Sequence, residues 1–151
     1  MNGMTIDRFW RRVNDVHRQL AGWAAMSLAT GALLAVGGTP FWRGVGVQFL
    51  VWGAIDGAIA AAGWRDRRRA ARSGLDRDPI GSEHRRQRLH RLLLVNVGLD
   101  VVYLAIGAAL LGFDAGPVRA GHGVGVIVQG GFLLLFDAWH AARLRRPVMS
   151  R

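Results

Sequence analysis

Residues 92–112 read LLLVNVGLDVVYLAIGAALLG, and Asp100 is the only charged residue among them. A run of about 20 apolar residues is long enough to cross the hydrocarbon core of a bilayer as a helix. Three more runs of this kind occur along the 151-residue chain. A soluble helix of such length would carry a stripe of charged residues, which these runs lack. The sequence therefore predicts four transmembrane helices and disfavours a soluble bundle.

The expected fold is a single all-α integral membrane domain covering residues 1–151. Four spans that cross the membrane in alternating directions predict an up-down-up-down four-helix bundle. The polar, arginine-rich segment 65–88 is expected to be a cytoplasmic loop. The absence of cysteine excludes disulfides, thiolate metal sites and cysteine nucleophiles. The four expected spans cover approximately residues 18–37, 42–64, 89–112 and 122–142.

The arginines indicate which way the bundle faces. All 20 basic residues are arginines, and 18 of them, including Arg151, lie before the first span, between the second and third, or after the fourth. Only Arg43 and Arg119 lie on the other side. Because positive charge is retained in the cytoplasm, we expect both termini there and the protein in the inner (plasma) membrane. These arginines should contact anionic lipid headgroups, and without a motif that reads nucleic acid the net charge of +10 does not indicate a nucleic-acid partner.

The two halves of the chain resemble each other. Gln48 is followed by Asp56 in the second span, and Gln129 is followed by Asp137 at the same spacing in the fourth. A unit of two spans inserts each time in the same orientation, so such units are parallel repeats about an axis along the membrane normal. The sequence therefore predicts two parallel two-helix repeats in which the second and fourth helices are equivalent.

Polar residues recur at helical spacing in the last three spans. Gln48, Trp52 and Asp56 are four residues apart and share one helix face. Polar side chains facing lipid are costly, so these stripes should point into the bundle. The candidate ligand-binding residues are Gln48, Trp52, Asp56, Asn96, Asp100, Tyr103, Gln129, Asp137 and His140.

The aspartates Asp56, Asp100 and Asp137 should lie at a similar depth, because each is six to nine residues from an arginine. That spacing places them about 9–13 Å inward from the arginine level. Three carboxylates in one dry pocket cannot all stay charged without compensation. Since the chain has no lysine and its arginines lie only at or beyond the ends of the spans, protons, His140, an arginine reaching in or a bound cation must balance them. Alternatively, these side chains only tie the helices together by hydrogen bonds.

One family resemblance supports this choice of residues. The segments 96–103, 121–125 and 129–137, together with Trp52-Gly-Ala-Ile-Asp56, are similar to a family of small uncharacterised bacterial four-span integral membrane proteins. The resemblance implies the fold and the polar positions. It implies no activity.

Three functions are compatible with these residues. The favoured one is proton-coupled binding or transport of a small molecule or cation at the acidic site. The first alternative is an intramembrane enzyme in which Asp56, Asp100 and Asp137 act as acid catalysts on a prenyl chain, quinone or lipid. The second is a structural or assembly protein, and a homo-oligomer is compatible with each. No cofactor or metal is expected, although the three aspartates with His140 would be the ligands of a metal variant.

Overall fold

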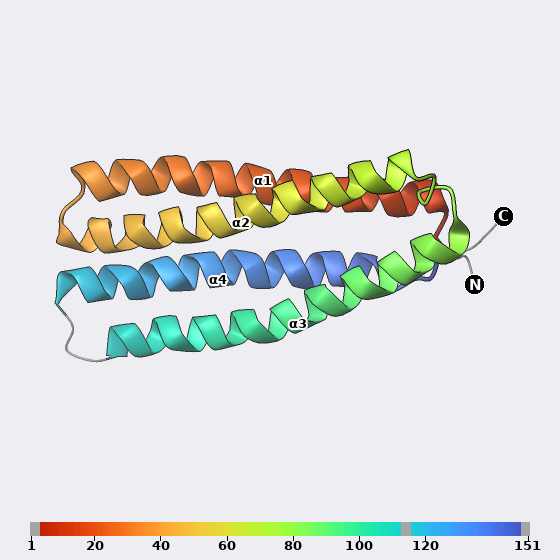
Figure 1. The fold of residues 1–151 in the computed structure, drawn as a ribbon. Coiled ribbons are helices and arrows are strands. Elements are labelled where there is room, and N and C mark those ends of the chain that lie inside the picture. The colour runs from red at the N-terminus through yellow and green to blue at the C-terminus, as the bar shows by residue number, and fades with distance from the viewer. Residues whose placement is uncertain (1–3, 113–115, 149–151) are drawn as a thin grey trace.

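The structure, a computed structural model, describes residues 4–112 and 116–148, so the expected positive charge of Arg151 lies outside the described residues. These residues form an all-α four-helix bundle, as predicted (Figure 1). All four helices are long and apolar enough to cross a membrane, which indicates a multi-pass membrane protein. The helices are α1 (Ile6–Gly37), α2 (Pro40–Arg72), α3 (Pro79–Gly112) and α4 (Pro117–Arg143).

The helices begin at residues that suit a first turn. Pro40, Pro79 and Pro117 open α2, α3 and α4, where the missing N–H of proline costs nothing. The Asp78 carboxylate accepts hydrogen bonds from the backbone N–H groups of Ile80 and Gly81, each at 3.0 Å. These contacts fix the start of α3 and end the chain reversal that follows α2.

The bundle consists of two helical hairpins. α1 packs along α2, α3 packs along α4, and the hairpins meet where α2 packs against α4 (Figure 1). A Cβ atom at Gly31 would lie 2.8 Å from the backbone oxygen of Gly46, and one at Gly107 would lie 3.0 Å from that of Gly123. Glycine thus allows close backbone contact in both hairpins. The similar arrangement fits two parallel repeats, which stay a prediction.

The prediction of a loop over residues 65–88 is wrong, because all of this segment except residues 73–78 is helical. The start of α1 and the end of α4 lie at the same end of the bundle as residues 73–78, and we call this the arginine-rich end (Figure 1). The helices continue here because they enclose an apolar core at this end of the bundle. Its buried members are Met4, Phe9, Trp10, Val13, Ala70, Leu93, Ala141, Leu144 and Val148.

Buried polar contacts hold this end together. The indole N–H of Trp10 on α1 donates to the Ser82 hydroxyl on α3 at 3.3 Å. The buried Arg86 forms an ion pair with Glu83 at 2.6 Å and also donates to the carbonyl oxygen of Leu144. The backbone N–H of Val148 donates to Glu83 at 2.8 Å. The C-terminal segment is therefore fastened to α3 through one buried arginine and one carboxylate.

Candidate functional site

Three carboxylates from three helices meet inside the bundle. Asp56 on α2, Asp100 on α3 and Asp137 on α4 are only 2%, 3% and 5% exposed. Asp56 interacts electrostatically with Asp100, and Asp137 interacts with both of them. Asn96 is exposed on α3, and its side chain is a polar neighbour of Asp137. We call Asp56, Asp100 and Asp137 the acidic cluster.

Two carboxylate oxygens of the acidic cluster lack a hydrogen-bond partner among the described residues. Oxygen Oδ2 of Asp56 and Oδ2 of Asp100 are buried and accept no hydrogen bond from any described residue. Ion pairs within the described part of the chain join arginines to Asp66, Asp76 and Glu83 instead. A buried carboxylate without such partners is costly unless it holds a proton or a cation. The cluster therefore has unused binding capacity at two oxygens.

Apolar and aromatic side chains enclose the cluster along the bundle axis. Trp52 and Tyr103 lie one helical turn farther from the arginine-rich end, with ring centroids 4.8 Å apart and planes at 72°. Ala60 and Leu133 are one turn from Asp56 and Asp137, and both belong to a buried apolar cluster with Phe136. The carboxylates thus lie between apolar layers, where charge is poorly solvated.

The two glutamines of the expected site make separate contacts between helices. Gln129 on α4 is fully buried, accepts a 2.7 Å hydrogen bond from the indole N–H of Trp23 and donates to Ser27 at 3.1 Å. Gln48 on α2 donates to Nδ1 of His122 on α4 at 3.0 Å. Each glutamine therefore joins α4 to a neighbouring helix and has its own partners.

His140 contacts Gln19 and Phe136 rather than the acidic cluster. Its Nε2 lies 3.1 Å from Oε1 of Gln19 on α1, and its ring packs edge-on against Phe136 with centroids 4.5 Å apart. Within residues 4–112 and 116–148, no three histidine or carboxylate side chains are arranged to hold a metal ion. The four ligands of the metal variant are therefore not arranged as a metal site among the described residues, and His140 contacts α1 instead.

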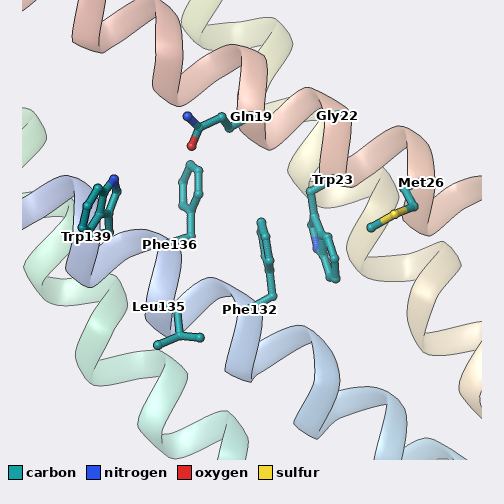
Figure 2. Close-up of a pocket in the computed structure, with 8 residues that line it drawn as sticks. All are labelled: Gln19, Gly22, Trp23, Met26, Phe132, Leu135, Phe136 and Trp139. Atoms are coloured by element: carbon teal, nitrogen blue, oxygen red, sulfur yellow. The ribbon is translucent and has the colours of Figure 1, made fainter.

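A groove that sequence patterns did not indicate lies between α1 and α4, and Figure 2 shows the side chains that line it. Its volume is about 700 Å³ and its wall is largely apolar. Trp23 stacks on Phe132, with ring centroids 3.7 Å apart and planes at 8°. We call it the α1–α4 groove. It is lined by Gln19, Gly22, Trp23, Met26, Phe132, Leu135, Phe136 and Trp139.

Comparison with known proteins identifies one relationship. Residues 19–138 match the model of a family of unknown function, DUF6992. No curated protein and no solved structure matches the chain. The matched segment contains the acidic cluster and, apart from His140, all the other residues of the expected site.

Proposed function

The chain belongs to this family of unknown function, and we propose that its acidic cluster binds protons in exchange for a small cationic ligand. The observation that carries the proposal is the pair of buried oxygens, Oδ2 of Asp56 and Oδ2 of Asp100, that accept no hydrogen bond from any described residue. Acidic side chains inside membrane helices commonly belong to proton or ion pathways. Proton-coupled transport is the function that uses such a site most directly.

The proposed orientation follows from charge. We place the arginine-rich end in the cytoplasm of a bacterial cell, with the helices in the inner membrane, because arginine is retained on the cytoplasmic side. The acidic cluster would then lie in the cytoplasmic half of the bilayer, because Asp56 precedes Arg65 by nine residues and Asp100 follows Arg91 by nine. The cluster would then be reached by the shorter path from the cytoplasmic side, and a transported ligand would leave on the opposite side.

Exchange follows from the electrostatics of the cluster. Two or three like charges in a poorly solvated site repel each other strongly, so the empty site favours protons. A cation that binds beside one carboxylate stabilises the charged form and releases a proton from the cluster. Binding of the cation and release of the proton are therefore linked, which is the requirement for coupled transport.

The alternative functions have less support. An enzyme acting on a prenyl chain, quinone or lipid needs its acid beside the substrate, and the residues that line the α1–α4 groove include none of the acidic cluster. A purely structural role would favour paired side chains, whereas Asp56 and Asp100 each keep an oxygen without a partner within the described residues.

The proposal is tested by measuring proton release from purified protein in weakly buffered detergent. We expect tetraphenylphosphonium, Na⁺ or K⁺ to release protons from the wild type. The Asp100→Asn variant should lose most of this release. Asp7→Asn, which alters an exposed carboxylate at the arginine-rich end, should leave the release unchanged. Equal release from Asp100→Asn and the wild type, or no release with any of these cations, would overturn the proposal.

A further inference from the structure

A second groove, at the arginine-rich end between α1, α2 and α3, has a volume of about 680 Å³. The residues that line it are basic toward the arginine-rich end and apolar farther along the bundle. On α3, Arg85 and Arg88 line the part nearer the helix start, and Leu92 lines the part beyond them. On α2, Ile59 lies deeper in the bundle than Arg67. The groove therefore combines an apolar part at the level of the expected spans with a basic part outside them.

The basic part retains charge that the protein does not neutralise. Arg85 pairs with Asp66 at 2.6 Å, and Arg67 pairs with Asp76 at 3.3 Å. Arg88 is exposed and makes no ion pair or hydrogen bond with the described residues. The buried Nε–H of Arg67 also finds no acceptor there. The groove thus offers an anion the free guanidinium of Arg88, and Arg67 lines the same groove.

Trp10 holds two of these arginines in place. The guanidinium carbon of Arg67 lies 4.5 Å from the centroid of the Trp10 ring, and that of Arg85 lies 5.9 Å away. Such contacts orient a guanidinium without consuming its hydrogen-bond donors. The indole itself is fixed by its hydrogen bond to Ser82. The basic wall is therefore preorganised.

We propose that this groove binds one anionic phospholipid, with its phosphate at Arg88 and Arg67 and one acyl chain along Ile59 and Leu92. Phosphate oxygens accept charge-assisted hydrogen bonds from arginine. Ile59 and Leu92 are exposed large apolar side chains, which an acyl chain would cover. A soluble phosphate compound would leave this apolar part empty, whereas a phospholipid fills both parts. The inference is independent of the function proposed for the acidic cluster.

Native mass spectrometry of the full chain in detergent tests the charge recognition. With phosphatidylglycerol added, we expect a one-lipid complex that phosphatidylcholine does not replace. Arg88→Gln should weaken the complex by about tenfold, the effect of losing one hydrogen bond to a charged group. Arg68→Gln is the matched control, because Arg68 is exposed at the same end and does not line the groove. It should weaken binding by less than about twofold, the small effect expected of a distant exposed charge.

A second pair of variants tests the apolar part without changing charge. Ala62 lines the groove on α2, and Ala58, one turn away and also exposed, does not. Ala62→Trp should fill the groove and weaken lipid binding, while Ala58→Trp should not, provided that both retain the wild-type melting temperature. Equal losses in Arg88→Gln and Arg68→Gln would mean diffuse attraction and overturn the proposal. Displacement of the lipid by equimolar glycerol 3-phosphate would overturn it in favour of a soluble phosphate site.

Discussion

The indole N–H of Trp23 on α1 donates a 2.7 Å hydrogen bond to Oε1 of Gln129 on α4. The amide of the same glutamine donates to the Ser27 hydroxyl at 3.1 Å. These bonds lie beside the α1–α4 groove, because Trp23 also lines it. Gln129 uses its acceptor and a donor at once, so it fixes the position of α1 on the second hairpin.

Replacement of Gln129 should reveal this link as a measurable coupling energy. Gln129→Leu removes both hydrogen bonds and leaves the Ser27 hydroxyl buried without its partner. Hydrogen bonds between membrane helices contribute about 0.6–1.7 kcal/mol in double-mutant cycles. We expect a coupling energy of that size between Gln129→Leu and Ser27→Ala, measured by unfolding in mixed micelles. Strict additivity of the two changes would show that the bond contributes nothing.

Substitutions in and beside the acidic cluster should differ in their effect on the stability of the bundle. Asn96→Ala removes a polar neighbour of Asp137 and should destabilise the bundle by up to about 1 kcal/mol. Asp56→Asn removes one of three like charges and should leave stability equal or higher, because functional acidic groups are commonly held at the expense of stability. Thermal unfolding of both variants in detergent measures this. A large loss of stability in Asp56→Asn would mean that the cluster serves packing.

Glu83 should make stability depend on pH. The Arg86 side-chain hydrogen bonds, with help from the Val148 N–H, lower the pKa of Glu83 from 4.5 to about 2. A carboxylate with a lowered pKa stabilises the folded state above its unfolded pKa, and this contribution is lost as pH falls from about 4.5 toward 2. Glu83→Gln should therefore cost about 1–2 kcal/mol near neutral pH, allowing for its partial exposure.

The difference between Glu83→Gln and the wild type should shrink as pH is lowered from 7 toward 3. Melting temperatures in a detergent that is insensitive to pH measure this difference. Asp7→Asn, an exposed carboxylate at the same end without an ion pair among the described residues, is the control and should show no such trend. If the Glu83→Gln difference were constant with pH, the pair with Arg86 would not be the source of stability.

Helix spacing was sufficient to predict the fold, and it predicts that the three aspartates point into the bundle, where the structure buries each of them. Runs of about 20 apolar residues define four helices whatever their neighbours are. The distances of Asp56 and Asp100 from the nearest arginines predict a similar depth for the two, because the rise of a helix is constant. Since a charged side chain should point away from lipid, depth and helix face together predict that the carboxylates lie in one region of the bundle.

Helix spacing could not reveal contacts that depend on how each helix is rotated against its neighbours. Gln129 and Asp137 are eight residues apart on one face, yet Gln129 reaches α1 while Asp137 joins α2 and α3. A stripe two helical turns long can meet different neighbours as the helices cross. Trp10 lies near a span end, a position typical of lipid-facing belts, but it is buried because α1, α2 and α3 continue together beyond the expected membrane.

Glycine at the contact of α2 with α4 should be required for the two hairpins to meet. A Cβ atom at Gly121 would collide with the backbone carbonyl oxygen of Phe41, so Gly121→Ala must push α2 and α4 apart. We expect a loss of about 1–3 kcal/mol from such overpacking. A Cβ atom at Gly131 on the same helix would meet no neighbouring atom within 4 Å, so Gly131→Ala should gain up to about 1 kcal/mol from helix propensity. Unfolding of both variants in one detergent gives the comparison, and equal stability would mean that close contact at Gly121 does not hold the hairpins together.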